Sequence, residues 1–485
     1  MRSILARFRR PYIAGLPEQL MLMNSTGDGS TLTLDFTTGV LDPRLTFDRT
    51  SLGTYVGPDG YLYGADSSTS SQTIGSSGTK TFTLSATAGL NRRYGVGDTV
   101  IASSGANNMS GTVTSYDPST QVLSFTASSS TGSGTFTSWI IGTRMARFDY
   151  DPTTGSPRGL LIEGSATNLC LNGSMAYTAT APTSWVRGFN GCTVASVDST
   201  TFPGQKAWSI SATAINQRDL LEQVISLDAN TTYTVSVYLE AVTGTPLTFA
   251  YMTGLPAGAT SGTVVNPSAG RVTFTVTVGA TAGNGTLRVG IGSAIGTGVS
   301  ADASVRFSHV QVETGSGASS YILTGASQGT RNADECSMTG TNFSSWFNAT
   351  EGTFLANARR MRTTDVGRIA SANDNTANES IDIGASTTGQ FIVTDGGSAL
   401  ATITPGTVTA NTAFKIAGAF KLNDVQAALG GTLGTPDTGV TLPTVNQLMI
   451  GRQAGGSPVY LNGTVSLLKF WPTRLPDSQL QSLTT

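Results

Sequence analysis

Apolar and polar side chains alternate over short stretches along most of the chain. The pattern is clearest in TLTLDF at residues 31–36, in YTVSVYL at 233–239 and in VTFTVTV at 272–278. Because successive side chains of a strand point to opposite faces of a sheet, this alternation predicts strands with one buried face. Clusters of Gly, Pro, Asn and Asp separate the stretches and predict turns. The chain is therefore predicted to be all-β.

The pattern breaks at several places, which divide the chain into parts. Linkers rich in Ser, Thr and Gly flank a run of short strands and indicate an inserted small barrel. Residues 171–335 contain seven or more short stretches of strand pattern separated by turn residues, which is typical of a β-sandwich. The predicted parts are a basic N-terminal arm (1–30), a β module (31–65 plus 141–170), the inserted small β-barrel (66–140), a first sandwich (171–335) and a second sandwich (341–485).

Composition agrees with this fold class and narrows the function. Only 12% of the 485 residues are charged, 58 are glycine, and the formal net charge is −2. Small and β-branched residues suit pleated surfaces and tight turns. A near-neutral chain gives no reason to expect nucleic acid as a partner.

The chain shows no membrane or export segment by its pattern. No stretch of about twenty apolar residues is present, so we expect no transmembrane helix and no membrane insertion. The start carries arginines ahead of apolar residues, yet Pro17, Glu18 and Gln19 interrupt the apolar core that a secretory signal requires. We therefore expect no signal peptide.

Cysteine and histidine are scarce. His309 is the single histidine, which excludes a His-rich metal site, and we expect it to be a surface or packing residue at a strand edge. The cysteines lack CxxC spacing and an odd number cannot all pair, so buried free thiols in a reducing cytoplasm are predicted. They are Cys170, Cys192 and Cys336.

Catalysis is not predicted. Glycan cleavage requires two carboxylates held a fixed short distance apart. No GxSxG elbow for serine hydrolysis is present. We expect no catalytic residues, because no two of the candidate acids share a motif. We also expect no cofactor. These acids are Asp219, Glu222, Glu240, Glu313 and Glu351.

One loop, TSWVRGFNGC, is the best candidate for binding sugar. Sugar sites combine an aromatic face for the apolar side of a pyranose with polar groups that bind hydroxyls. Trp185 and Phe189 supply aromatic rings, and Arg187 and Asn190 supply polar groups. The alternative for Trp185 is a core or lip residue of the sandwich.

A second polar cluster, Asn373–Asn375, has the oxygen donors that calcium prefers. Its single carboxylate, Asp374, favours a solvated polar turn instead. We therefore predict no metal.

The N-terminal arm is the only locally basic segment. It is interpreted either as a frayed terminus or as an arm that orders on an acidic or grooved partner. The residues predicted to make such contacts are Arg2, Arg7, Phe8, Arg9, Arg10 and Tyr12, with Ile4 and Leu5 between them.

Four phrases carry a family resemblance. They are LTFDR (45–49), YVGPDG (55–60), RFDYDPTTGSPRGLLIEGSATNLC (147–170) and FSHVQVETGSGASSYILTGASQGTRNAD (307–334). With them, residues 31–65 and 141–485 resemble head-spike and tail-fibre proteins of tailed bacteriophages. The first sandwich is similar to jelly-roll carbohydrate-binding modules, and the second to laminin-G or concanavalin domains with their short terminal helix.

The resemblance implies a function and partners. It implies a virion surface protein, assembled in the host cytoplasm as a homotrimer, that docks to capsid, portal or tail by its N-terminal part. The sandwiches would then bind host-surface polysaccharide, weakly at each site and more strongly through several copies. The alternative is a capsid decoration protein without receptor activity, and a glycan-cleaving tailspike is a third.

Overall fold

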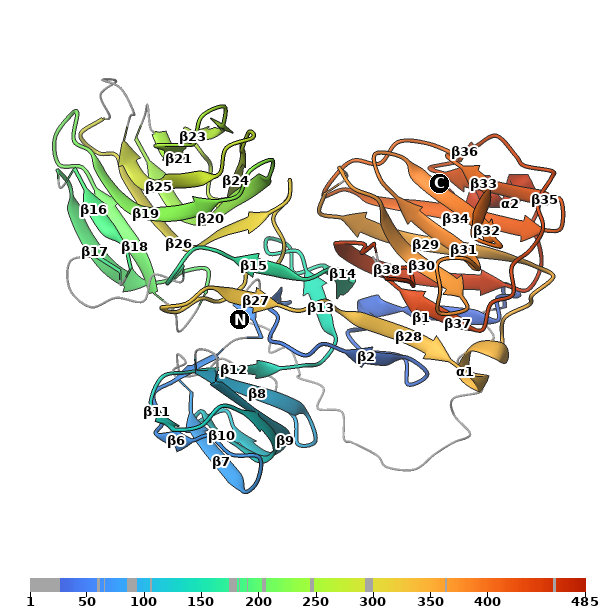
Figure 1. Ribbon diagram of the computed structural model, residues 1–485, viewed down its shortest axis with the longest axis horizontal. Coiled ribbons are helices and arrows are strands. Elements are labelled where there is room, and N and C mark those ends of the chain that lie inside the picture. The colour runs from blue at the N-terminus through green and yellow to red at the C-terminus, as the bar shows by residue number, and fades with distance from the viewer. Residues whose placement is uncertain are drawn as a thin grey trace, which may run out of the picture.

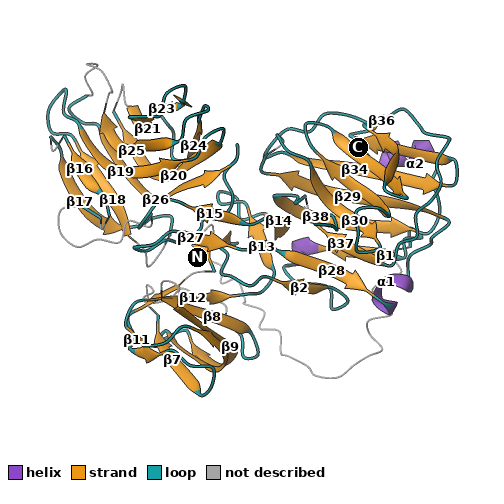
Figure 2. Cartoon of the chain, viewed as in Figure 1, coloured by secondary structure: helices purple, strands orange, loops and turns teal. Residues whose placement is uncertain are grey.

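The computed structural model describes residues 27–485 apart from 59–61, 65, 85–93, 105–106, 174–180, 183, 190, 203–205, 245–247, 293–299, 363 and 457–458. The described residues form three β lobes around a central junction (Figure 1). Strands dominate, and helix within these residues is limited to α1 (Thr341–Ser344), α2 (Asp477–Thr484) and a 3-10 turn, η2 (Phe36–Thr38) (Figure 2). The predicted all-β class is confirmed.

The C-terminal lobe is a sandwich of two antiparallel sheets. One sheet has the order β13 (Arg147–Tyr150), β14 (Pro157–Ile162), β38 (Gly463–Trp471), β29 (Glu351–Arg360), β34 (Ala413–Lys421), β35 (Asp424–Leu429) and β36 (Thr432–Leu433), and β1 (Leu32–Asp35) also pairs with β38. The other has the order β2 (Thr46–Asp48), β28 (Glu335–Thr339), β37 (Gln447–Ile450), β30 (Gly367–Asn373), β31 (Ser380–Ala385), β32 (Gly389–Asp395) and β33 (Ser398–Ile403).

Strands from early in the chain belong to this C-terminal sandwich. The sequence assigns 31–65 and 141–170 to a module of their own, but β1, β2, β13 and β14 hydrogen-bond into the two C-terminal sheets. Leu34 and Leu160 are fully buried in the same core as Phe354 and Phe470. These early strands belong to the C-terminal lobe because their apolar faces are buried against sheets formed more than 180 residues later. No local sequence pattern reveals this domain boundary.

The first sandwich forms the second lobe. Its five-stranded sheet has the order β16 (Val186–Gly188), β19 (Asp219–Leu227), β25 (Gly283–Gly292), β21 (Thr248–Thr253) and β23 (Thr263–Val265). Its six-stranded sheet has the order β17 (Thr193–Asp198), β18 (Lys206–Ser211), β26 (Ser304–Thr314), β20 (Thr232–Thr243), β24 (Gly270–Thr277) and β22 (Thr260–Ser261). Inward-facing residues such as Trp208, Leu221, Val235 and Val289 form the core between them.

The third lobe is small and lies between the other parts of the chain in sequence. Its six-stranded sheet has the order β5 (Asp66–Ser68), β12 (Trp139–Thr143), β8 (Thr99–Ser104), β9 (Asn107–Asp117), β10 (Val122–Thr131) and β7 (Thr79–Thr83), around a core that contains Phe82, Phe125 and Trp139. β5, the first strand of this lobe along the chain, pairs with β12, the last one, so that Asp66 lies opposite Ile141. The chain therefore enters and leaves this lobe at one place.

Short two-stranded ladders complete the described fold. They are β3 (Tyr55–Val56) with β4 (Leu62–Tyr63), β6 (Gln72–Thr73) with β11 (Thr135–Phe136), and β15 (Ala166–Asn168) with β27 (Gly329–Arg331). The last of these ladders lies between the two sandwiches, where the chain leaves one and enters the other (Figure 1).

The terminal helix and the cysteines lie as the sequence predicts. The terminal helix α2 begins after Pro476 and buries Leu480 against the outer face of the β29–β38 sheet. All three cysteines are buried thiols, as expected. No helix among the described residues is both long enough and apolar enough to cross a bilayer.

Candidate functional site

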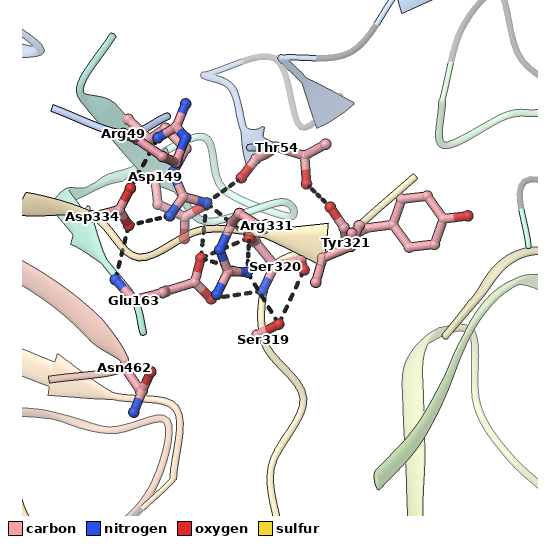
Figure 3. A network of polar contacts seen from close by, with 12 residues as sticks. Arg49, Thr54, Asp149, Glu163, Ser319, Ser320, Tyr321, Arg331, Asp334 and Asn462 are labelled. Atoms are coloured by element: carbon pink, nitrogen blue, oxygen red, sulfur yellow. Dashed lines mark hydrogen bonds and ion pairs between the residues drawn. The ribbon is translucent and has the colours of Figure 1, made fainter. Parts of the chain in front are cut away.

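Two places on the molecule concentrate unusual side chains, a buried ionic junction and an exposed aromatic–arginine face. The junction lies where the lobes meet and consists of Arg49, Arg147, Glu163, Arg331 and Asp334 (Figure 3). Each of these side chains is at most 1% exposed. Such burial of charge is tolerated only where the charges are paired and hydrogen-bonded.

Ion pairs and backbone bonds link every member of the junction. Asp334 pairs with Arg49 at 2.9 Å and with Arg147, and it accepts a bond from the Glu163 amide at 2.9 Å. Glu163 pairs with Arg147 at 2.8 Å and with Arg331 at 3.3 Å. Ser320 donates to the Glu163 carboxylate from its amide at 2.7 Å and from its hydroxyl at 2.6 Å.

Electrostatics at the junction follow from this geometry. Burial alone would raise the pKa of Glu163, but the charges of Arg331 and Arg147 and the bonds from Ser320 hold that pKa at about 2. Burial and the nearby charge of Arg147 lower the pKa of Arg49 to about 10, against the pull of Asp334. Glu163 is therefore ionised at neutral pH, and three guanidinium groups face two carboxylates.

The junction joins all three lobes. Arg49 follows β2 of the C-terminal sandwich and donates to the carbonyl of Thr143, which ends β12 of the small lobe, at 3.1 Å. Ser320 follows β26 of the first sandwich. The sequence phrases at 45–49, 147–170 and 307–334 therefore converge on one structural joint, which connects the lobes.

The exposed face belongs to the five-stranded sheet of the first sandwich, next to the loop that the sequence singles out. Arg187 anchors the base of this loop, because its guanidinium group binds the fully buried Asp219 carboxylate with Nε–Oδ1 at 2.8 Å. It also donates to the carbonyl of Cys192 at 2.6 Å. The hydrogen bonds to Asp219 raise the pKa of Arg187. Arg187 is thus a positioning residue.

Phe189 projects from the anchored loop. Its φ of +63° is a left-handed conformation that is rare outside glycine, and its side chain is 47% exposed. The guanidinium carbon of Arg218 lies 4.5 Å from the centroid of its ring, and that of Arg288 lies 5.7 Å away. These distances fall in the range of cation–π contacts.

Paired strands extend the face away from the loop. Glu222 on β19 lies opposite Val186 on one side and opposite Arg288 on the other, and its Oε1 is 2.9 Å from Nε of Arg288. Tyr251 lies on the far side of Arg288, with the guanidinium carbon 5.9 Å from its ring centroid. Val186 is 68% exposed. Tyr251 is only 4% exposed, so the face presents the Phe189 ring, guanidinium donors and one carboxylate to solvent.

Sequence reasoning missed most of this face. Its members come from strands up to 100 residues apart, and only Arg187 and Phe189 of the predicted site lie in or beside it. The alternation of buried and exposed residues in β19 and β25 is the sequence signal for this face, because Glu222, Val224 and Arg288 take the exposed positions. Strand pairing, which sequence alone does not reveal, brings them together.

Trp185 is not the aromatic platform that the sequence predicts. Its side chain is 5% exposed and packs in the sandwich core, the alternative that the sequence left open. Asn190 lies outside the described residues. The same is true of the predicted docking residues of the arm, Arg2, Arg7, Phe8, Arg9, Arg10 and Tyr12.

His309 is a core residue, so the expectation of a strand-edge position is wrong. It is fully buried on β26, with Phe202 and Tyr321 at ring-centroid distances of 3.9 and 4.7 Å. Its Nδ1 lies 2.7 Å from the Ser308 hydroxyl. Burial, with a smaller effect from the charge of Arg271, lowers the pKa of His309 to about 3, so the ring is neutral at physiological pH.

The candidate acids have separate partners. Their partners are Arg187 for Asp219, Arg288 for Glu222, Ser199 and Ser308 for Glu240, Gln311 and Ser319 for Glu313, and the amide of Arg474 for Glu351.

The Asn373–Asn375 cluster forms a turn. Asn373 is buried and accepts bonds from the Asn375 amide at 2.9 Å and from Gln447 at 2.8 Å. Asp374 accepts from the amide and hydroxyl of Thr376 at 2.8 and 2.6 Å. These bonds go to Oδ1 of Asn373 and Oδ1 of Asp374 and hold the turn in place. Within the described residues, no group of three or more His, Cys, Asp or Glu side chains is placed to hold a metal.

The sequence matches no protein-family model and no curated protein. Parts of the chain are similar to solved carbohydrate-binding domains. The CBM40 of the Ruminococcus gnavus IT-sialidase bound to α2,3-sialyllactose has 14% identity and a TM-score of 0.27, covering 30% of this chain and 88% of that one. Domain 4 of AbnA, a GH43 extracellular arabinanase from Geobacillus stearothermophilus in complex with arabinotriose, has 11% identity and a TM-score of 0.25, covering 35% and 82%.

A third similar structure is the binding domain of botulinum neurotoxin DC in complex with SialylT. It has 11% identity and a TM-score of 0.25, covering 31% of this chain and 39% of that one. Because these likenesses are distant and partial, function has to be inferred from the exposed face itself.

Proposed function

We propose that this chain is a non-catalytic glycan-binding protein of a tailed-phage virion surface. The N-terminal part would dock to capsid, portal or tail, and the sandwiches would bind host-surface polysaccharide. Copies would assemble as a homotrimer in the host cytoplasm, and the virion surface would be the final location. The phrases at 45–49, 147–170 and 307–334 resemble those of phage head-spike and tail-fibre proteins, which supports the virion role. The face around Phe189 supports glycan binding.

The face carries the proposal because its chemistry is that of sugar recognition. Phe189, a residue that is 47% exposed, offers its ring as an apolar surface to a pyranose, and guanidinium groups beside it donate in fixed directions to oxygen. The guanidinium groups of Arg218 and Arg288 both lie against the Phe189 ring, so donors for carboxylate oxygen stand beside its apolar surface. We therefore propose that the face prefers a glycan that bears carboxylate groups over a neutral one.

Substitution of Phe189 tests the face directly. Phe189→Gly removes the ring and also suits the left-handed backbone, so the loop is not strained. Loss of an aromatic contact of about 1 kcal/mol weakens binding to immobilised acidic oligosaccharides roughly fivefold. Leu422→Gly removes another exposed apolar side chain, 58% exposed on the C-terminal lobe, and is expected to leave binding unchanged. Equal binding by both variants and the unsubstituted protein would disprove the assignment.

Competition with intact phage tests the wider function. Soluble protein added to host cells is expected to slow phage adsorption in a saturable way, and Phe189→Gly protein is expected to need a higher concentration. A well-folded protein that binds acidic oligosaccharide but never slows adsorption would contradict the receptor role. It would favour the decoration alternative.

A further inference from the structure

A groove of about 680 Å³ opens between the small lobe and the C-terminal sandwich, away from the face around Phe189. One wall is formed by Asp98 and Thr99 of the small lobe. The opposite wall is formed by residues that follow η2, by β2 and by the chain that leads into β13. They include Val40, Leu41, Phe47, Met145 and Phe148. A volume of this size is in the range of ligand pockets.

Apolar side chains line the groove without being covered. Val40 is 64% exposed and Met145 is 48% exposed, and half-buried rings of Phe47 and Phe148 lie between them. Val96, at 76% exposure, lies in the turn that immediately precedes Asp98. Uncovered aliphatic and aromatic groups from two lobes are typical of a surface that receives a polypeptide, and methionine adapts to such partners.

The polar groups of the groove favour a basic occupant. Asp48 and Arg144 pair with each other at 3.0 Å and cancel in charge. Asp98 lies on the other wall, where its carboxylate accepts a bond from the Gly95 amide at 2.7 Å. Among the charged residues that line the groove, this leaves one negative charge without a cation. An apolar segment that carries a basic side chain complements this wall.

We propose that the groove receives residues 2–12 of the same chain. This segment, RSILARFRRPY, carries four arginines together with Ile4, Leu5, Phe8 and Tyr12. The 26 residues before Gly27 span up to about 85 Å when extended, and Val40 is only 13 residues beyond Gly27. A tethered segment has an effective concentration in the millimolar range, which favours its own groove over that of another copy.

What this contact does for assembly rests on the proposed function, which assigns the same arginine-rich residues to docking on the virion. The groove would hold the segment while the protein is free, and a virion partner would have to displace it. Free copies would therefore present less exposed apolar surface to one another before assembly.

Limited trypsin digestion of the full chain tests the groove. Trypsin can cut after Arg7 and Arg9 but not after Arg10, because Pro11 follows it. Mass spectrometry follows the peptides that these cuts release. In the unsubstituted protein these cuts are expected to be slow. The double substitution V40N/M145Q, which replaces both apolar side chains with neutral polar ones, is expected to speed them at least tenfold. The matched control Ile215→Asn replaces a 68%-exposed isoleucine of the first sandwich and is expected to have no effect.

A second variant covers the case in which V40N/M145Q does not fold. F8S/Y12S changes only the segment, and faster hydrogen exchange of the amides at 145–148 is expected when the groove empties. Equally fast arginine cuts in all variants, with no change in exchange, would overturn the proposal. Slow cuts that become fast on dilution would also overturn it, by assigning the segment to a second copy. These measurements need no glycan, so failure here leaves the face around Phe189 untouched.

Discussion

Glu163 lies between two guanidinium groups in a place that water does not reach. Replacing it with Gln keeps the shape but removes the charge that neutralises Arg147 and Arg331. Breaking a buried pair by removing one partner typically costs about 3–5 kcal/mol, because the remaining charge stays buried. We expect Glu163→Gln to lower the free energy of unfolding by that amount in chemical denaturation.

An exposed pair provides the matched control. Asp198 and Lys206 pair at 2.5 Å, but their side chains are 86% and 52% exposed, so solvent screens the interaction. Asp198→Asn is expected to change stability by less than about 1 kcal/mol. A similar small loss for Glu163→Gln would show that the junction does not hold the lobes together.

His309 makes stability depend on pH. Its pKa is about 3 in the folded protein and about 6.5 when unfolded, so between these values the unfolded chain binds the extra proton. This contribution to stability is complete above pH 6.5 and is lost as the pH falls toward 3. From pH 7 to 4.5 the loss from this group is about 2.7 kcal/mol, at 1.36 kcal/mol per pH unit.

Urea unfolding at the two pH values checks this. His309→Gln, which does not titrate, is expected to lose less stability than the unsubstituted protein over the same interval, by about 2.7 kcal/mol. The difference between the two proteins cancels the effect of the carboxylates. Identical pH dependence would show that the folded protein protonates His309 freely.

At the scale of elements, β14 shows how a strand is committed to a distant sheet. It pairs with β13 on one side and with β38 on the other, with Leu160 opposite Val465. Gly159 permits this approach, since its φ is +102° and a Cβ there would lie 2.1 Å from the carbonyl oxygen of Val465. The turn residues between Asp151 and Pro157 suit the hairpin of β13 and β14, but no local pattern shows the sheet that this hairpin joins.

Alanine at Gly159 is therefore expected to be costly. Backbone strain of about 1–3 kcal/mol adds to the clash with Val465, so the total loss of stability should exceed about 3 kcal/mol. Gly396→Ala is the control. Gly396 has a φ of +59°, but a Cβ there would meet no described atom within 4 Å, so only the backbone cost of about 1–2 kcal/mol applies. Equal losses in thermal or urea unfolding would mean that β14 and β38 do not approach this closely.

The whole molecule is built from lobes that differ in how they are attached. The two sandwiches share the buried junction and the ladder of β15 with β27, whereas the small lobe is entered and left through paired strands, with Asp66 opposite Ile141. Replacing residues 66–141 with Gly-Gly is expected to leave the sandwiches folded, because the ends to be joined are adjacent.

Calorimetry checks the excision. The unfolding temperature of the remaining lobes is expected to shift by less than about 4 °C, which corresponds to roughly 1 kcal/mol for domains of this size. Binding to acidic oligosaccharides is expected to persist. A drop of about 10 °C or more would mean that the small lobe stabilises the junction, through contacts such as that of Arg49 with the Thr143 carbonyl.

The sequence by itself determined the strands, the turns and the all-β class, because alternation and turn residues act over a few neighbours. It also placed Phe189 in a loop and marked the phrases that meet at the junction. Tertiary structure alone decided which strands pair, that Trp185 and His309 are buried, and that Arg49 binds Asp334 across 285 positions. The reason is physical: an alternating pattern specifies that a face must be buried but not what covers it, and charge pairing depends on how separate lobes meet.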